Sequence, residues 1–403
     1  MFKNFFKFKE INIVALSSYA SQLGFAITQR FHSKNNRNSK NKDKTLYILF
    51  IYPTRTDIDI VNRANVEGFL KNNLVKGNIE IQSLLIKNNY RRLLAYLYIL
   101  LIRIIKRKKN ITLWQPRYLF LEDTFSFKNN LFKLPLKEFN TILFGDGFLN
   151  FMPINKPFWL SKNNNIENNL IINKKNLIAS YHSFKLQDNR KFDISSKKIS
   201  NLYLLKCIEE YIEYEFDLKL TKSLNLIRKE LFTFNKEYLR IYIFPLTTFY
   251  ETGRTSLKKE IELYLEFLRK SSLKNYDLLI LKSHPGNEKE KINLFTRQLK
   301  NDDDFKLINI ISNKIFEDSF PLERIPLEIL VSYLNILNNK KEIKLDMCLT
   351  CSSTATLSTK LIIKNCKIEF AFGEKLINKY LYKEFSKKRI EQENYILDQI
   401  KNI

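Results

Sequence analysis

The chain has 403 residues, too many for one ordinary hydrophobic core, so two domains of roughly 150–200 residues are expected. Hydrophobic residues make up 44% of the chain and aromatic residues 13%, which excludes an intrinsically disordered protein. The net charge of +26 is compatible with nucleic acid, an anionic membrane or an acidic substrate, and equally with a bias toward the Lys, Asn, Ile and Phe of A/T-rich codons. The sequence contains no aromatic-glycine RNA-binding signature and no paired Cys/His finger, so no nucleic-acid partner is expected.

The first half of the chain alternates strand and helix patterns, as in a doubly wound α/β domain. A strand at Ile11–Leu16 leads into a helix that begins near Tyr19, without a GxGxxG dinucleotide fingerprint. The further predicted elements are strands at Thr45–Tyr52, Ile79–Leu85, Ile111–Trp114 and Thr141–Phe144 and helices at Asp57–Asn72, Leu202–Phe216 and Leu220–Phe232. Between these, the polar stretch that begins at Asn155 is expected to be irregular.

The longest apolar run is Leu93–Ile105, which Arg103 interrupts and the basic sequence KRKKN follows. This run is too short to span a bilayer. Its length favours a buried core helix. The alternative is an interfacial helix whose Arg/Lys end meets anionic lipid.

The second half repeats the alternation of strands and helices. Ser256–Lys270 is predicted to be an amphipathic helix with Ser256 as its N-cap. The predicted strands are Leu239–Phe249, Leu278–Leu281, Phe305–Ile311, Lys344–Thr350 and Cys366–Phe372, and a further helix is expected at Ile325–Leu337. This pattern predicts a second doubly wound domain.

The turn Lys282–Gly286, with the sequence KSHPG, directly follows a predicted buried strand. Open α/β sheets bind ligands where a strand ends in such a turn before a helix. Pro285 stiffens the turn because its ring fixes φ, and Gly286 allows the backbone to bend or to approach a ligand closely. His284 is one of only three histidines in the chain. Lys282 either adds positive charge here or points into solvent.

Two more polar turns stand at predicted strand ends. Asp146 lies between Gly145 and Gly147, either as a plain Asp-Gly turn or as a carboxylate presented to a cleft. The cluster Ser352, Ser353 and Thr354 precedes a helix, either as N-caps or as a phosphate site. A carboxylate, a histidine and a hydroxyl cluster suit a group transfer in which Asp146 takes a proton and the others hold a phosphate.

The acidic and cysteine pairs of the chain do not predict a metal site. Asp57-x-Asp59 and Asp302–Asp304 match the DxD pattern of metal-dependent transferases, but their places at helix ends favour caps or solvated turns. Cys348-x-x-Cys351 lacks a second half-site, so the four cysteines are interpreted as reduced core thiols of a cytosolic protein.

Three motifs in this order resemble those of bacterial sialyltransferases of the GT-B fold: Gly145-Asp146-Gly147, Lys282-x-His284-Pro285 and Ser352-Ser353-Thr354. The α-2,8-polysialyltransferase family is the nearest likeness, and the lipooligosaccharide sialyltransferase family is next. The segment LTTFYETGRTSLKKEIELYLEFL also resembles the polysialyltransferase pattern. One position departs from it, because Gly145 stands where the family carries its first acidic residue.

The resemblance implies two Rossmann-like doubly wound domains that face a central cleft. Residues 1–235 would form the acceptor-side domain with the Gly-Asp-Gly turn, and residues 236–403 the donor-binding domain with C-terminal helices. The implied reaction is inverting transfer of sialic acid from CMP-sialic acid, without a metal or other cofactor, to a capsular polysaccharide or lipooligosaccharide. Because CMP is already a good leaving group, one carboxylate is enough.

The resemblance also implies roles for particular residues. Asp146 takes the place of the general base and His284 that of the residue that contacts the CMP phosphate. The donor-binding positions are Lys282, His284, Pro285, Ser352, Ser353, Thr354 and, in a segment that matches a ribose contact, Glu328. Glu328 is equally explained as a charge in the first turn of a helix.

The expected partners are therefore a nucleotide-sugar donor, a glycan acceptor and, peripherally, the anionic inner membrane. The expected localisation is cytoplasmic, at the inner face of a bacterial plasma membrane. Two alternatives stay open: a transferase of the same fold that uses CMP-Kdo or a UDP- or GDP-sugar, and a non-enzymatic protein that binds polyanions or membranes.

Overall fold

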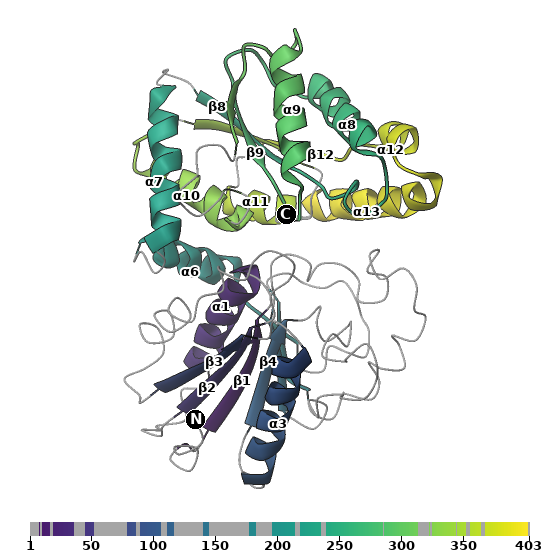
Figure 1. Cartoon of the computed structure of the whole chain (residues 1–403). Helices are drawn as coiled ribbons and strands as arrows, with labels where there is room; N and C mark the ends of the chain where they lie inside the picture. Colours follow the sequence, from purple (N-terminus) through teal and green to yellow (C-terminus); the bar gives the residue numbers. More distant parts are fainter. Residues whose placement is uncertain are drawn as a thin grey trace. The chain divides into compact units, whose positions relative to one another are not determined.

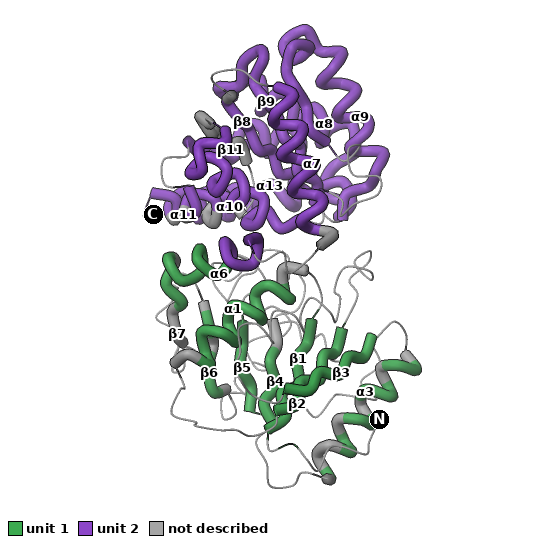
Figure 2. The backbone as a smooth tube through the Cα atoms, turned by 90° about the vertical axis from the view of Figure 1, so that its left-hand side faces the viewer, with its two compact units in different colours: residues 1–207 green, residues 208–403 purple. Residues whose placement is uncertain are grey.

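The structure is a computed structural model that forms two compact units, residues 1–207 and 208–403 (Figure 2). It describes residues 8, 10–16, 19–35, 45–51, 79–85, 89–105, 111–116, 140–144, 177–182, 196–213, 218–234, 239–284, 286–312, 322, 325–343, 345–351, 355–363 and 367–401. The division falls within α6 (Asn201–Glu213), so α7 (Leu218–Thr233) belongs to the second unit by its contacts, whereas the sequence places a boundary after residue 235. The roles assigned to the two domains stay predictions.

The first unit is built on a seven-stranded sheet in the order β3-β2-β1-β4-β5-β6-β7, and every described pairing in it is parallel. Its strands are β1 (Glu10–Leu16), β2 (Thr45–Ile51), β3 (Ile79–Leu85), β4 (Ile111–Pro116), β5 (Asn140–Phe144), β6 (Leu177–His182) and β7 (Ser196–Lys198). The strand order reverses direction between β1 and β4, as in a doubly wound fold.

Two helices cover opposite faces of this sheet, α1 (Tyr19–Asn35) and α3 (Asn89–Ile105) (Figure 1). Ala95 and Tyr98 of α3 join a core cluster with Ile11 and Ile13 of β1. On the other face, Phe25 of α1 packs edge-on against Trp114 with ring centroids 5.5 Å apart, and Trp114 Nε1 donates a hydrogen bond to the buried Asn12 Oδ1 at 2.8 Å. Successive side chains of β1 thus point to alternate faces, both of which are covered.

The second unit is built on a five-stranded parallel sheet in the order β10-β9-β8-β11-β12. Its strands are β8 (Leu239–Pro245), β9 (Leu278–Lys282), β10 (Asn309–Ile311), β11 (Leu345–Cys351) and β12 (Lys367–Phe370). Its helices after α7 are α8 (Leu257–Lys270), α9 (Lys289–Asn301), α10 (Leu327–Asn339), α11 (Ala355–Ile362), α12 (Glu374–Tyr380) and α13 (Lys383–Lys401). Its strand order reverses between β8 and β11.

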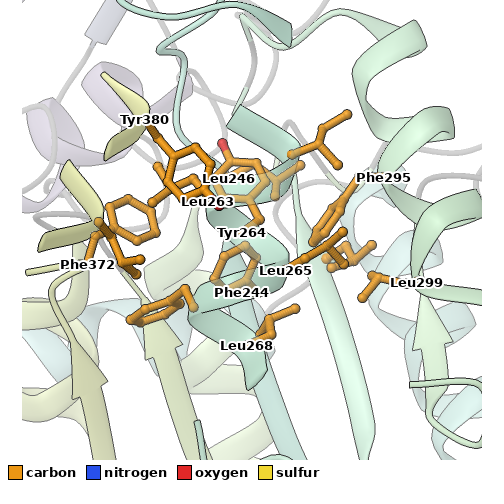
Figure 3. Packing of buried hydrophobic residues seen from close by; sticks show 14 of the residues in the cluster. Phe244, Leu246, Leu263, Tyr264, Leu265, Leu268, Phe295, Leu299, Phe372 and Tyr380 are labelled. Atoms are coloured by element: carbon orange, nitrogen blue, oxygen red, sulfur yellow. The ribbon is translucent and has the colours of Figure 1, made fainter. Parts of the chain in front are cut away.

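An aromatic core lies between this sheet and helices α8, α9 and α12 (Figure 3). Phe244 of β8 is at its centre, with Tyr264 of α8 at 5.3 Å and Phe295 of α9 at 6.1 Å between ring centroids. Helices α10 and α11 pack against each other on the other side of the sheet (Figure 1). Both units are therefore doubly wound, and the predicted fold class of two Rossmann-like α/β units, as in GT-B proteins, is confirmed.

Two features of the elements differ from the sequence prediction, and one predicted helix is not tested. The strands β6 and β7 lie in the polar stretch that begins at Asn155, for which no regular structure is predicted. The strand predicted from Phe305 begins only at Asn309, because Asp302–Leu307 forms turns in which Phe305 N donates to Asp302 O at 3.0 Å. The helix predicted at Asp57–Asn72 falls outside the described residues.

The interpretation of Leu93–Ile105 as a buried core helix is wrong. Helix α3 buries Ala95 and Tyr98 but leaves Leu94, Leu97 and Ile104 exposed, because only one side of the helix contacts the sheet. Length alone could not separate a buried helix from one with an uncovered apolar face. Among the described residues, no helix is long and apolar enough to cross a membrane.

Candidate functional site

The candidate site lies at the C-terminal edge of the second sheet. The strands β9, β8 and β11 are parallel and in register, since Ile243 pairs with both Ile280 and Leu349, and all three therefore end at one edge. Ligands of open α/β sheets bind at this edge, next to the reversal of strand order. Lys282 is the last residue of β9 and His284 follows that strand, and the predicted hydroxyl cluster Ser352–Thr354 stands in sequence between β11 and α11.

The imidazole of His284 is held in one tautomer by its own turn. The backbone N–H of Gly286 donates to His284 Nδ1 at 3.0 Å, so the proton of the neutral ring lies on Nε2. A side chain at Gly286 would crowd this contact, because an added Cβ would come within 3.3 Å of Nδ1. The exposed ring of His284 thus has an N–H donor available for an oxygen atom of a ligand.

The surroundings of His284 disfavour its protonation. Burial and the ammonium groups of Lys282 and Lys291 lower the pKa of His284 to about 4, against an opposing effect of the Glu251 carboxylate. Burial is the largest cause of this shift and the ammonium group of Lys282 is the next, whereas Lys291 has a smaller effect because Glu251 and Glu260 pair with it. At neutral pH the ring is an uncharged hydrogen-bond donor rather than a cation.

Lys282 is buried, and this excludes the alternative that it points into solvent. Its Nζ donates to Ser283 O at 3.0 Å and remains close enough to His284 to affect the pKa of the imidazole. The structure therefore brings two of the predicted donor-binding residues together at the end of β9. The positive charge of Lys282 and the N–H donor of the neutral His284 would favour an anion such as a phosphate.

A buried ion cluster, formed by Glu251, Glu260 and Lys291, lies next to the turn that carries His284. Lys291 Nζ lies 2.7 Å from Glu260 Oε1 and 3.0 Å from Glu251 Oε2, and the side chains of Lys291 and Glu260 are fully buried. Lys291 lies in the first turn of α9, Glu260 lies in the first turn of α8, and Glu251 belongs to the loop between β8 and α8. The cluster thus joins the segments that follow β8 and β9.

The remaining hydrogen bonds of the cluster are also satisfied. Glu260 accepts from the Thr247 hydroxyl at 2.7 Å, from the Tyr250 backbone N–H at 2.7 Å and from the Tyr264 hydroxyl. Burial opposes ionisation of Glu251, but Lys291 and a 3.0 Å hydrogen bond from Asn287 outweigh it and lower the pKa of this carboxyl. Satisfied partners are what make buried charges tolerable.

Asn287 links the cluster to the histidine turn. Its Oδ1 accepts from the His284 backbone N–H at 2.7 Å, and its Nδ2 donates to Thr247 O at 2.7 Å. Lys291 Nζ donates to the same Thr247 carbonyl at 2.7 Å. The backbone of His284 is therefore anchored to both the β8–α8 loop and the first turn of α9.

Sequence analysis did not single out this cluster, although the sequence contains a signal for it. Glu260 precedes Tyr264 by four residues, and Lys291 precedes Phe295 by four, so each charge lies on the apolar face of an amphipathic helix. A charge at such a position requires a buried partner of opposite sign. Two such charges, on consecutive helices, could have been paired on that basis.

The other predicted residues have different outcomes. Glu328 lies half-buried in the first turn of α10, a separate element from the histidine turn. Arg269 binds both Asp302, at 2.5 Å, and Asp304, at 3.2 Å, which confirms the interpretation of Asp302–Asp304 as a helix cap and solvated turn. The predicted positions outside the described residues are Gly145, Asp146, Gly147, Pro285, Ser352, Ser353 and Thr354.

In comparisons with known proteins, only solved structures match this chain. No family model matches the chain, and no curated protein matches it. Among solved structures, UDP-GlcNAc 2-epimerase from Methanocaldococcus jannaschii is 11% identical with a TM-score of 0.48, covering 95% of this chain and 92% of that one. UDP-GlcNAc 2-epimerase from Neisseria meningitidis, bound to UDP-GlcNAc, is 9% identical with a TM-score of 0.47, covering 95% and 90%.

A third similar structure is an α,α-trehalose-phosphate synthase (UDP-forming) from Burkholderia xenovorans, in complex with glucose-6-phosphate. It is 9% identical with a TM-score of 0.39, and the match covers 98% of this chain and 96% of that one. Likeness at this level does not assign a substrate to the present chain.

Proposed function

We propose that this protein is an inverting, metal-independent glycosyltransferase that transfers sialic acid from CMP-sialic acid to a cell-surface glycan. The acceptor would be a capsular polysaccharide or a lipooligosaccharide. The second unit would bind the donor, and the first unit would supply Asp146 as the general base. The likeness of three ordered motifs to bacterial sialyltransferases supports the choice of donor.

The observation that carries the proposal is the state of His284. A neutral imidazole whose Nε2–H is directed by the Gly286 contact can donate to a phosphate oxygen of CMP. As the bond from the phosphate oxygen to the sugar breaks, negative charge grows on that oxygen, and a positioned donor is then bound more strongly than before. The ammonium group of Lys282 favours the same charge, while Lys291 is paired with Glu251 and Glu260.

The remaining proposed roles follow from the resemblance. Ser352, Ser353 and Thr354 would bind the donor phosphate with their hydroxyls, Pro285 would shape the turn, and Glu328 would contact the ribose. Asp146 would remove the proton of the acceptor hydroxyl as that oxygen attacks the anomeric carbon of sialic acid.

Thermal unfolding of the purified chain with CMP, UMP, UDP or GDP, in the presence of a chelator, tests the donor class. A ligand at 100 times its dissociation constant adds roughly 2.7 kcal/mol to the free energy of unfolding. We expect stabilisation by CMP alone, and a clearly smaller stabilisation of His284→Ala. Equal stabilisation of the His284→Ala variant would remove His284 from the site.

Three other outcomes would contradict parts of the proposal. Stabilisation by UDP or GDP, and not by CMP, would indicate a transferase that uses a different nucleotide sugar. Transfer that stops when the chelator is added would contradict the metal-independent reaction. A chain that responds to no nucleotide but binds polyanions with a steep dependence on salt would be a non-enzymatic binding protein.

A further inference from the structure

Helix α3 carries an exposed apolar stripe, formed by Tyr90, Leu94, Leu97, Leu101 and Ile104. These residues recur at intervals of four and three, which places them along one side of the helix. All five are exposed, from 39% for Leu101 to 67% for Tyr90. The other exposed large apolar side chains of the described chain form no such stripe: they stand singly or, for Tyr276 and Leu307, as one pair joined by a backbone hydrogen bond, which is ordinary for a protein surface.

The helix is fixed on its sheet in a way that keeps the stripe outward. Ala95 and Tyr98 are buried against the strands of the first unit. The Tyr98 hydroxyl donates to Gln82 Oε1 of β3 at 2.6 Å, and Arg91 Nη1 donates to Leu85 O at 3.2 Å. Figure 2 shows α3 at the margin of the first unit. Rolling the helix to bury the stripe would break these contacts.

The charge of this stretch has a single sign. Residues 89–110 contain seven basic residues and no acidic one: Arg91, Arg92, Arg103, Lys106, Arg107, Lys108 and Lys109. A helix with an apolar side and a basic flank is typical of segments that lie in the interface of an anionic bilayer. We propose that α3 docks the protein on an anionic membrane surface, with the stripe at the boundary of headgroups and acyl chains and the basic residues among lipid phosphates.

Charge complementarity favours lipid over a second copy of the chain. Two α3 stripes packed together would bring two sets of seven positive charges to one interface, and residues 89–110 supply no carboxylate to offset them. Anionic headgroups supply that charge, and the acyl region accepts the leucines. The proposal does not depend on the transferase activity, because docking requires no nucleotide.

The test is co-sedimentation of the full chain with vesicles, without nucleotide. Vesicles of phosphatidylcholine that contain phosphatidylglycerol are compared with vesicles of phosphatidylcholine alone. We expect binding to the anionic vesicles only, weakened by salt because exposed charges are screened. The double variant Leu97→Ser with Leu101→Ser should bind at least about tenfold more weakly, since two leucines no longer enter the bilayer.

The matched control is Leu202→Ser with Leu307→Ser, which removes two leucines that are 79% and 43% exposed away from α3. This variant should bind as the wild type does. Equal binding by the stripe variant would overturn the proposal and leave charge elsewhere as the cause. A wild type that ignores vesicles would also overturn it. If the wild type ignores vesicles but forms a dimer that the stripe variant does not form, the partner of the stripe would be a second copy of the chain. A monomeric wild type would indicate that another part of the same chain covers the stripe.

Discussion

At the scale of single residues, the chemistry proposed for this protein depends on how His284 is prepared. The sequence identifies the residue, but the tautomer depends on a hydrogen bond from Gly286, two positions further along the chain. The low pKa depends on burial and on Lys282 and Lys291, of which only Lys282 is a neighbour in sequence. Sequence analysis could therefore single out His284 but could not give its charge.

We expect His284→Ala to weaken CMP binding roughly tenfold to a hundredfold, because a hydrogen bond to a charged group contributes about 1.5–3 kcal/mol. The fold should be unaffected, since the side chain is exposed. Titration calorimetry with CMP measures the affinity. His284→Asn, which keeps an N–H donor in this turn, should recover part of the loss. An affinity that is unchanged in His284→Ala would contradict a contact between this ring and the nucleotide.

The low pKa of His284 also predicts a dependence of stability on pH. The folded pKa of about 4 is below the ordinary 6.5, so between these values the unfolded chain binds a proton that the folded chain does not. Stability that is present above pH 6.5 is therefore lost as pH falls toward 4. Urea unfolding should show a smaller loss over this range in His284→Gln than in the wild type. The acidic groups are common to both proteins, so equal losses would contradict the shifted pKa.

At the scale of elements, the buried ion cluster links the first turn of α8 to the first turn of α9. Lys291 compensates two buried carboxylates, and removing one partner of a buried pair typically costs about 3–5 kcal/mol. Lys291→Met should lower the free energy of unfolding by about that amount. Lys306→Met is the matched control, because Lys306 pairs with Asp303 at the surface and should change stability by less than about 1 kcal/mol.

Urea unfolding of the two methionine variants measures both effects. A Lys291→Met variant as stable as Lys306→Met would show that the cluster contributes nothing net. The pKa of His284 provides a second measurement, independent of stability. Since the Lys291 ammonium helps to lower this pKa, it should rise in Lys291→Met when followed by NMR.

The helices and strands themselves could mostly be predicted from sequence, since apolar runs and periodicity determine them locally. The helix with Ser256 as its N-cap is confirmed, and the Ser256 side chain accepts from Lys259 N. What failed depended on tertiary contacts. The three-residue strand β7 carries no apolar pattern, and β10 is shortened by the turns of Asp302–Leu307. The exposed stripe of α3 could be decided only once the sheet beneath it was known.

At the scale of the whole molecule, alternation of strands and helices predicted two doubly wound units, and both strand orders confirm them. Alternation does not specify which strand lies beside which. The reversal between β8 and β11 makes these two strands neighbours, so that the chain leaves both of them at the same edge of the sheet. The segments that follow β8 and β9 share one edge of the sheet only through this topology.

The proposed division of roles between the units gives the last prediction. If the second unit binds the donor and Asp146 of the first unit serves only as the base, Asp146→Asn should leave stabilisation by CMP unchanged. Transfer should fall at least about a hundredfold, in keeping with the loss of a general base. His284→Ala should instead lose both donor binding and transfer. Thermal unfolding with CMP and a transfer assay, applied to both variants, separate these outcomes. Transfer that survives Asp146→Asn would reject this base, and CMP binding lost in that variant would reject the division between the units.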